Sequence, residues 1–309
     1  ELERLFDKIF ALHRVAPDAE ITLEANPDDL TPEKCRRLAA TPLNRLSIGV
    51  QSFHDEDLRF MNRAHDARQA RTALDAARAG GFDNLSLDLI YGTPTLDEER
   101  WLENLRLALR YGVPHLSCYS LTVEPRTALA AFIQQGKVPA PDEGAAARQF
   151  ELLMDFAAAE GFDHYEISNF ARPGFIARHN SAYWRGQPYL GIGPSAHSFD
   201  GQARQWNVAH NPRYIRALER GELPAQIETL TPAQRYNEYV LTGLRTRWGC
   251  TLEGVGRFGE AFPAHFLQAA EPHLLSGALL QQEGRFTLSR SGKLLADRIA
   301  LDLFVEVED

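Results

Sequence analysis

The chain has 309 residues, 44% of them hydrophobic and 24% charged, which is typical of a soluble globular protein with one barrel-sized domain or a large and a small one. Its 42 acidic and 33 basic residues give a formal net charge of −9, which argues against nucleic acid as a partner because phosphate binding needs clustered cations. No apolar run approaches the roughly 20 residues of a membrane-spanning helix, so we do not expect an integral membrane protein.

Residues 1–20, ELERLFDKIFALHRVAPDAE, predict an amphipathic helix. They do not resemble a signal peptide, because they have neither an apolar core nor a basic start. Cys35, Cys118 and Cys250 are far apart and odd in number, which favours neither a disulfide framework nor a metal site. We therefore expect buried, reduced thiols in a cytoplasmic protein.

The first two thirds of the chain alternates strand-like with helix-like segments. Strands are expected at 19–26, 44–53, 84–92, 115–124 and 163–171. Helices are expected between them at 67–81, 95–112 and 142–161. A capping box, Thr95 with Glu98, predicts the start of the second of these helices. Strands separated by helices of this length indicate parallel β/α units.

Polar residues fall late in three of the otherwise apolar strands, namely Glu24, Gln51 and Asp88. In β/α barrels, ligand-binding groups converge at the carboxyl ends of the strands. An unpaired buried carboxylate is costly, so three polar groups at equivalent depths suggest a shared ligand. This pattern favours a barrel over an open doubly wound sheet. The alternative from the residues alone is that these side chains only cap local turns.

The pattern changes beyond about residue 205. Helices are expected at 231–249, 251–259 and 263–277, then a hairpin at 278–289 that turns at Glu283-Gly284, and a last helix at 289–304. Helices followed by a hairpin resemble a winged-helix arrangement, although the basic residues form no stripe that would suit DNA. The expected fold class is α/β: a partial β/α (TIM-like) barrel over 1–205 and a helical, winged-helix-like domain over 206–309.

Four blocks, ITLEANPDDLT, RLSIGVQSF, MNRAH and LSLDLIYGTP, resemble in order and spacing the radical S-adenosylmethionine (SAM) enzymes related to oxygen-independent coproporphyrinogen III oxidase. The resemblance covers essentially the whole chain and implies a partial barrel with SAM and a [4Fe–4S] cluster at the strand ends. It implies that Arg63 pairs with the methionine carboxylate, which suits a guanidinium fork. It also implies SAM contacts from Glu24, Gln51 and Asp88, with Gly49 leaving space for the adenine.

One part of that family's pattern is missing from this sequence. Family members begin with a strand carrying CxxxCxxC, whose thiolates bind the cluster, and continue with a second strand and a glycine-rich turn. Neither is found here, and the spacing of the three cysteines excludes a shared loop. We therefore expect an N-terminally shortened member that binds no cluster, binds SAM weakly, and has an opened barrel edge through which two copies could pair.

A further motif, HNSAYW at residues 179–184, matches HNxxYW of one branch of the family, the HemW-type haem chaperones. The match implies that the chain binds haem and delivers it to haem-accepting proteins. A neutral imidazole is a common axial ligand of haem iron, which makes His179 the candidate ligand. Aromatic rings can form walls for the macrocycle and arginines can pair with its propionates. The haem-binding candidates are Arg178, His179, Asn180, Tyr183, Trp184 and Arg185.

Other readings stay open at this stage. From the residues alone, HNSAYW could equally be a turn with core aromatic residues, and His197 in GIGPSAHS is a weaker ligand candidate. His115 and His164 lie on expected strands and are interpreted as structural. The functional alternatives to a haem chaperone are oxidative decarboxylation of coproporphyrinogen III through a 5′-deoxyadenosyl radical, and a non-catalytic interaction module. The HNSAYW motif favours the haem chaperone.

Overall fold

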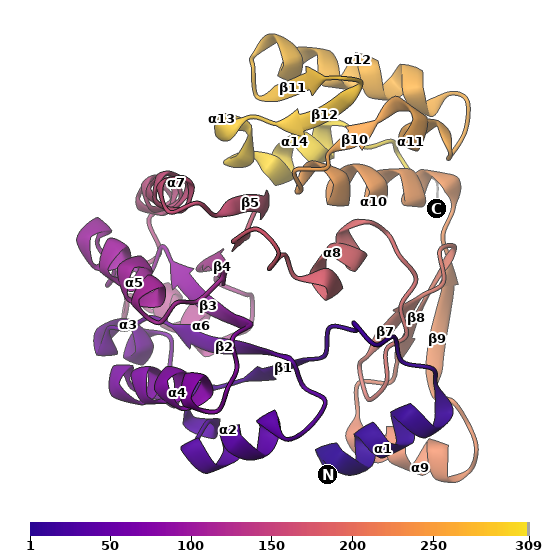
Figure 1. The fold of residues 1–309 in the computed structure, drawn as a ribbon. Helices are drawn as coiled ribbons and strands as arrows, with labels where there is room; N and C mark the ends of the chain where they lie inside the picture. The colour runs from indigo at the N-terminus through magenta and orange to yellow at the C-terminus, as the bar shows by residue number, and fades with distance from the viewer. Residues whose placement is uncertain (308–309) are drawn as a thin grey trace. The chain divides into compact units, whose positions relative to one another are not determined.

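The computed structural model describes residues 1–307, which form two compact units. Unit 1 comprises Glu1–Ala177, and unit 2 begins at Arg178 (Figure 1). The domain division expected between residues 205 and 206 falls inside strand β8 (Ala203–Asn207). Each unit is described separately below.

Unit 1 is built on one six-stranded sheet with the order β1-β2-β3-β4-β6-β5. The strands are β1 (Thr22–Ala25), β2 (Arg45–Gln51), β3 (Leu85–Tyr91), β4 (His115–Ser120), β5 (Asp163–Glu166) and β6 (Asn169–Ala171). Strands β1 to β4 pair in parallel, as the alternation of strands and helices predicts. Strand β6 runs antiparallel to both of its neighbours.

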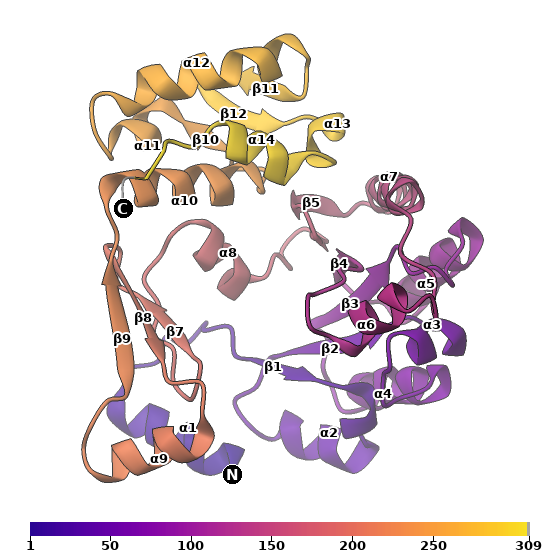
Figure 2. The ribbon, with the colours of Figure 1, turned by 180° about the vertical axis from the view of Figure 1, so that it is seen from behind.

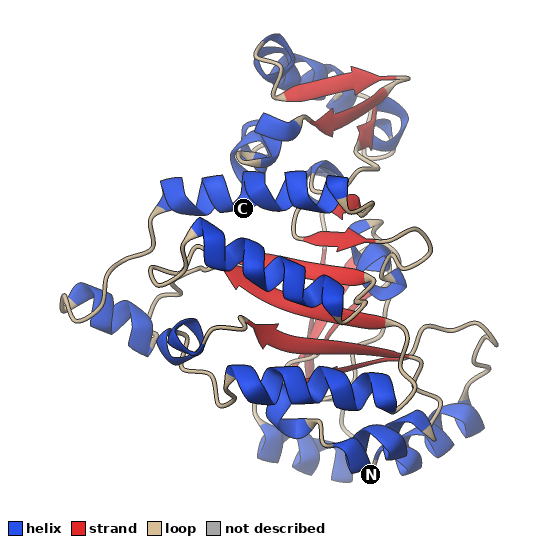
Figure 3. Ribbon diagram, turned by 60° about the vertical axis from the view of Figure 1, so that its left-hand side comes forward, coloured by secondary structure: helices blue, strands red, loops and turns tan. Residues whose placement is uncertain are grey.

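Several helices of unit 1 cover one face of this sheet. The helical elements are α1 (Leu2–Leu12), η1 (Pro27–Asp29), α2 (Pro32–Ala39), α3 (Asp55–Phe60), α4 (Ala67–Ala79), α5 (Glu98–Arg110), α6 (Ala128–Gln134) and α7 (Glu143–Ala159). Figure 1 shows α4, α5 and α7 on the same side of the strands, and Figure 3 shows helices lying side by side over the sheet. The helices expected at the N-terminus, at 67–81 and at 142–161 are confirmed.

The capping box predicted at Thr95 is wrong. Helix α5 starts two residues later, where the Asp97 side chain accepts a hydrogen bond from the Arg100 backbone N–H at 2.8 Å. The Thr95 hydroxyl instead donates to Oδ1 of the buried Asp57 at 2.6 Å. The Thr95 hydroxyl is therefore used in a tertiary hydrogen bond to Asp57, and Asp97 caps the helix in its place.

The alternation of side chains along the strands gives the sheet two different faces. One face carries Leu46, Ile48 and Val50 of β2, which are fully buried in the core with apolar residues of α4, α5 and α7. The opposite face carries Ser47, Gly49 and Gln51 of the same strand. Polar residues continue across that face on β3 and β4, where Ser86, Asp88, His115 and Ser117 lie.

The segment expected as one strand at 163–171 is a hairpin of two strands, and the single-strand prediction is wrong. The Glu166 carboxylate stabilises its two-residue turn, because Oε2 accepts hydrogen bonds from the Ser168 backbone N–H at 3.1 Å and from Asn169 Nδ2 at 2.5 Å. No glycine or proline marks this turn in the sequence. Strand β6 consequently inserts next to β4 in the antiparallel direction.

The first part of unit 2 contains a second sheet that the sequence pattern did not predict. Helix α8 (Arg178–Trp184) precedes three antiparallel strands in the order β7-β8-β9. The remaining elements are β7 (His197–Phe199), β8, α9 (Asn211–Glu219) and β9 (Ala225–Thr229). The backbones of Tyr189 and Phe199 form an additional antiparallel bridge, which attaches the loop after α8 to the start of this sheet.

The remainder of unit 2 has the winged-helix-like arrangement that was expected, visible at the yellow end of the chain in Figure 2. Its elements are α10 (Pro232–Leu244), β10 (Cys250–Thr251), α11 (Leu252–Gly256), α12 (Phe262–Leu275), β11 (Leu279–Gln282), β12 (Arg285–Leu288), α13 (Arg290–Lys293) and α14 (Ala296–Asp302). The β11–β12 hairpin turns at Glu283 (φ 49°) and Gly284 (φ 75°), as predicted. The single last helix expected at 289–304 is instead broken at Leu295, whose backbone leaves the helical region.

Two other expectations about the chain are tested by the structure. Cys35, Cys118 and Cys250 are buried and form no disulfide, as the sequence predicts. Among residues 1–307, no helix combines the length and the apolar character needed to cross a bilayer.

Candidate functional site

The polar face of the unit 1 sheet brings together residues from its first three strands. In the parallel register, Glu24 of β1 pairs with Ser47 of β2, and Ser47 pairs with Ser86 of β3. Asp88 therefore lies two residues further along the same face. Gln51 ends β2, where its backbone adopts the left-handed conformation (φ 66°) and the register shifts. The three polar residues expected near strand ends thus share one face of adjacent strands.

Asp88 lies at the centre of this polar face. Ser47 Oγ donates to its Oδ1 at 3.4 Å, and Ser117 of β4 also forms a hydrogen bond with the carboxyl. Burial raises the pKa of Asp88, and the two serines, Arg45 and the nearby negative charge of Glu24 modify the rise, the serines and Arg45 lowering the pKa and Glu24 raising it, so that the pKa is about 6. The carboxyl group therefore changes its charge close to neutral pH.

A second group of polar atoms surrounds Gly49. Arg63 Nη2 donates to Asn26 Oδ1 at 2.7 Å, which connects the loop after α3 to the end of β1. A Cβ atom at position 49 would lie 2.8 Å from Gln51 Nε2, 3.6 Å from Arg63 Nη2 and 3.7 Å from Asn26 Oδ1. The missing side chain of Gly49 therefore makes room for three polar groups to converge.

The loop that carries Arg63 is held by a buried histidine. His65 Nε2 lies 3.0 Å from the carbonyl oxygen of Val50, and the Arg63 backbone N–H donates to the carbonyl of Leu58 at 2.9 Å. Burial lowers the pKa of His65, so the neutral ring that binds this carbonyl is favoured. His65 thus fixes the position from which the guanidinium of Arg63 reaches the strand ends.

Sequence reasoning missed Asn26, Ser47, His65 and Ser117 at this site. Asn26 and Ser47 stand two residues from positions that were identified, so the period of two along a strand was the signal that could have found them. His65 lies within the MNRAH block, but its role as a support depends on the fold of the loop.

The strand-rim site, defined here as Glu24, Asn26, Gln51, Arg63 and Asp88, presents both signs of charge. The two carboxyl groups are electrostatically coupled, and Arg63 lies with Gln51 around Gly49. The Nε atom of Arg63 is buried and has no hydrogen-bond partner within residues 1–307. A zwitterionic ligand with a carboxylate, a cationic centre and hydroxyl groups satisfies this set of donors and acceptors.

The described residues do not fit an iron–sulfur cluster. The three cysteines are buried on separate elements, and burial raises the pKa of each thiol. Thiolate is the form that binds metal, so these thiols are poor ligands. Residues 1–307 contain no group of three or more His, Cys, Asp or Glu side chains placed to hold a metal ion.

A cavity of about 530 Å³ lies within unit 2, and the HNSAYW motif contributes to it. Tyr183, Trp184 and Arg185 line the cavity. His179 does not line it; its ring meets the Tyr183 ring edge-on, with centroids 4.7 Å apart. Arg178 is exposed at the start of α8.

The other histidines considered as ligands lie elsewhere. His197 is exposed on β7 and stacks on Trp206 at 6.3 Å. His115 is fully buried between Ser86 Oγ and the Tyr165 hydroxyl, each 2.7 Å from a ring nitrogen. His164 stacks on Phe170 with ring centroids 4.0 Å apart. Of these four histidines, His179 is the one in ring contact with a residue of the cavity.

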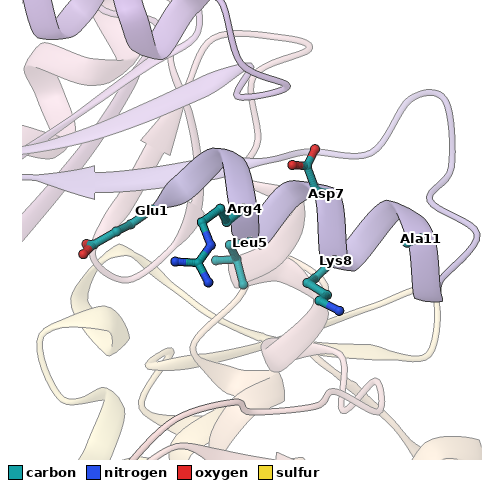
Figure 4. Close-up of a pocket in the computed structure, with 6 residues that line it drawn as sticks. All are labelled: Glu1, Arg4, Leu5, Asp7, Lys8 and Ala11. Atoms are coloured by element: carbon teal, nitrogen blue, oxygen red, sulfur yellow. The ribbon is translucent and has the colours of Figure 1, made fainter.

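A larger hollow of about 630 Å³ lies along α1 and has no feature of a site. Its lining is Glu1, Arg4, Leu5, Asp7, Lys8 and Ala11, which belong to α1 and its N-cap residue (Figure 4). Figure 4 shows Arg4 and Lys8 pointing to one side of the helix and Asp7 to the other. Side chains from one exposed helix do not converge on a ligand, so the cavity in unit 2 is the better candidate.

Comparisons with known proteins identify relatives of both units. The sequence model of the Radical SAM superfamily matches residues 2–108. The haem chaperone HemW of Mycobacterium tuberculosis is 37% identical over 98% of this chain and 76% of its own length. HemW of Bacillus subtilis is 33% identical over 97% of this chain and 80% of its own length. The solved structure of coproporphyrinogen III oxidase (HemN) from Escherichia coli, a radical SAM enzyme, is similar with a TM-score of 0.80 over 98% of this chain and 74% of that one; at 24% identity it supports the fold alone.

Proposed function

The chain belongs to the family of the haem chaperone HemW, within the radical SAM superfamily, and from this membership we propose that it binds haem and delivers it to haem-accepting proteins. The observation that carries the proposal is the position of HNSAYW, whose Tyr183, Trp184 and Arg185 line the cavity of unit 2. Aromatic walls and a guanidinium suit a flat macrocycle that carries carboxylates.

We further propose that the strand-rim site holds SAM. Arg63 binds the methionine carboxylate, since its guanidinium is the cation of the site and its Nε is free of other hydrogen bonds within residues 1–307. Asp88 and Glu24 provide acceptors for cationic and hydroxyl groups, and Gly49 leaves room for the ligand to approach the backbone. In radical SAM proteins, SAM supplies a 5′-deoxyadenosyl radical when a reduced [4Fe–4S] cluster is bound beside it. The described residues offer no ligands for that cluster, so no step is assigned to it.

Haem binding is tested by titrating the chain of residues 1–309 with hemin and following the Soret absorption. Tyr183→Ala is expected to lower occupancy roughly tenfold, because it removes an aromatic wall of the cavity. The matched control is Phe132→Ala on α6, because Phe132 is an aromatic residue with a similar exposure: 44%, against 40% for Tyr183. A Soret band that keeps the position and intensity of free hemin when the unsubstituted chain is added, or absence of haem transfer to apomyoglobin, would overturn the proposal.

The axial-ligand role of His179 stays a prediction, and the same titration checks it. Loss of an axial imidazole in His179→Ala moves the Soret maximum of the bound haem. If His179→Ala removes only the edge-on ring contact with Tyr183, the Soret absorption of the bound haem decreases and the wavelength of its maximum stays unchanged.

The SAM site is tested by calorimetric titration with SAM in the absence of haem. Arg63→Gln is expected to weaken SAM binding roughly tenfold or more, because it removes the cation that meets the carboxylate. Arg59→Gln, an exposed arginine on α3, is the control and is expected to leave binding unchanged. Equal SAM affinity in the two variants would remove Arg63 from the site.

A further inference from the structure

The cavity of unit 2 is built from elements far apart in the sequence. It lies between α8 with its following loop, strands β7 and β8, and the helices α10 and α11. Its volume of about 530 Å³ lies within the range of small-molecule sites, roughly 300–1,000 Å³. All of its lining residues belong to unit 2.

Aromatic side chains line this cavity from two directions. On one side, Tyr183, Tyr189 and Phe199 form a continuous series, with ring centroids 4.4 Å and 6.3 Å apart. On the other, Tyr239 and Phe258 lie with centroids 5.7 Å apart. A Cβ atom at Gly254 would overlap the Tyr239 hydroxyl, so this glycine lets the second group pack against α11. Two groups of aromatic rings in the lining of one cavity favour a flat, largely apolar ligand.

Positively charged side chains outnumber negatively charged ones in the lining of the cavity. Four arginines line it, and Glu238 is the one carboxylate among the lining residues. Arg204 Nη2 already pairs with Glu238 Oε1 at 2.9 Å. The three other guanidinium groups, Arg185, Arg235 and Arg257, have no carboxylate partner within the lining.

Two of these three arginines lie over aromatic rings. The guanidinium carbon of Arg185 lies 4.1 Å from the centre of the Trp248 ring, and that of Arg235 lies 5.6 Å from the centre of Phe258. The Nε atom of Arg235 is buried and has no hydrogen-bond partner within residues 1–307. Arg257 stands at the end of α11 and pairs with Glu253. Both side chains are more than 70% exposed, and an ion pair between exposed side chains is weak.

The lining contains no histidine, cysteine or methionine, the side chains that most often bind haem iron. From these contacts we propose that the cavity binds a tetrapyrrole through its ring and its propionates, so that binding does not require iron. Arg235 and Arg257 bind the carboxylates at one end, and the two aromatic groups hold the ring. This inference rests on the proposed haem-binding function and specifies how that site recognises its ligand.

The test compares three ligands on the chain of residues 1–309: hemin, metal-free protoporphyrin IX, and protoporphyrin IX dimethyl ester, whose carboxylates are blocked. Quenching of the intrinsic tryptophan fluorescence reports binding of each, because Trp184 and Trp248 line the cavity. Protoporphyrin IX is expected to bind within about threefold of hemin, and the dimethyl ester roughly tenfold or more weaker, since each charge-assisted pair contributes about a factor of ten.

Variants locate the carboxylate contacts. Arg235→Gln is expected to weaken the binding of protoporphyrin IX roughly tenfold, and Arg257→Gln, at a side chain that is 71% exposed, by a smaller factor; neither is expected to change the binding of the dimethyl ester. Arg235→Lys keeps the charge but loses the fork, and is expected to recover part of the affinity. Arg298→Gln is the charge-matched control, because this arginine lies on α14, is 79% exposed and does not line the cavity. Circular dichroism of each variant verifies that it is folded.

The outcomes separate this inference from the proposed function. Hemin binding without protoporphyrin IX binding would show that iron coordination governs recognition and would overturn the inference while leaving haem binding intact. Equal affinity for protoporphyrin IX and its dimethyl ester, or equal affinity in Arg235→Gln, Arg257→Gln and Arg298→Gln, would also overturn it. Failure of all three ligands would overturn the proposed function together with the inference.

Discussion

Asp88 is a buried carboxyl group of the strand-rim site, and its burial makes the charged form costly. Its neighbours are two serines and the charge of Glu24, and burial disfavours its ionised form. A buried carboxyl with a raised pKa makes the folded protein less stable wherever the group must be charged. Its retention at this position is explained if a ligand compensates for the charge, which is what the proposed SAM site provides.

The raised pKa of Asp88 predicts a pH-dependent effect of Asp88→Asn. The folded-state pKa of about 6 lies above the usual 3.8, so the folded state binds the proton more tightly and stability falls as pH rises from about 4 to about 6. Asp88→Asn removes that cost and is expected to be more stable than the unsubstituted chain at pH 7.5 by roughly 1–3 kcal/mol. At pH 4 the difference is expected to vanish.

Urea unfolding at both pH values measures the difference. Asp83→Asn is the control, because its side chain is 98% exposed and its substitution is expected to change stability by less than about 0.5 kcal/mol. A difference between Asp88→Asn and the unsubstituted chain that is the same at pH 4 and pH 7.5 would contradict a protonation effect.

At the scale of elements, local patterns predicted most of unit 1 because period and composition agree with tertiary packing there. The first four strands and the helices at 67–81 and 142–161 are examples. The prediction failed where a tertiary contact replaced a local one. Thr95 bonds to a carboxylate 38 residues away, and the β5–β6 turn is stabilised by Glu166 without glycine or proline.

The true cap of α5 predicts a stability difference between neighbouring residues. Asp97→Ala is expected to lower the free energy of unfolding by about 1 kcal/mol, because the Arg100 N–H loses its acceptor. Glu98→Ala removes only an exposed pair with Arg148 and is expected to cost less than about 0.5 kcal/mol. Chemical denaturation of the two variants measures both values. A larger loss for Glu98→Ala would restore the capping box predicted from the sequence.

Helix α13 depends on a glycine for its approach to β11. A Cβ atom at Gly292 would overlap the carbonyl oxygen of Ala278, which is backbone and cannot rotate away. Gly292→Ala is therefore expected to destabilise unit 2 by roughly 1–3 kcal/mol. The exposed neighbour Ser291→Ala is the control, with an expected change below about 0.5 kcal/mol. Thermal unfolding that is unchanged in Gly292→Ala would show that the backbone shifts without cost.

At the scale of the whole molecule, the two candidate sites differ in how far the sequence reveals them. Glu24, Gln51 and Asp88 of the strand-rim site could be predicted because they stand late in strands whose order is regular, whereas Arg63 was expected from the family resemblance and Asn26 was missed. The cavity of unit 2 could be predicted only in its HNSAYW part. Its arginines at 204, 235 and 257 come from three elements, and the sheet that carries the first was not predicted.

The division into two compact units predicts that each ligand protects its own part of the chain. Ligand binding stabilises the folded state to which it binds. Hydrogen exchange is expected to slow within residues 1–177 on adding SAM, and within residues 178–307 on adding protoporphyrin IX. Mass spectrometry of peptides from both units measures this. Protection of unit 1 by the porphyrin in the absence of SAM would place the porphyrin site elsewhere.

The backbone of Gln51 folds its side chain over Gly49, so these two positions are mutationally coupled. Alanine at 49 requires the terminal amide of Gln51 to move away, whereas the same alanine meets no close contact once residue 51 is also alanine. The double-mutant cycle should therefore be non-additive, with Gly49→Ala milder in the Gln51→Ala background. Along an evolutionary lineage, a shorter residue at position 51 would therefore make a side chain at position 49 easier to accept.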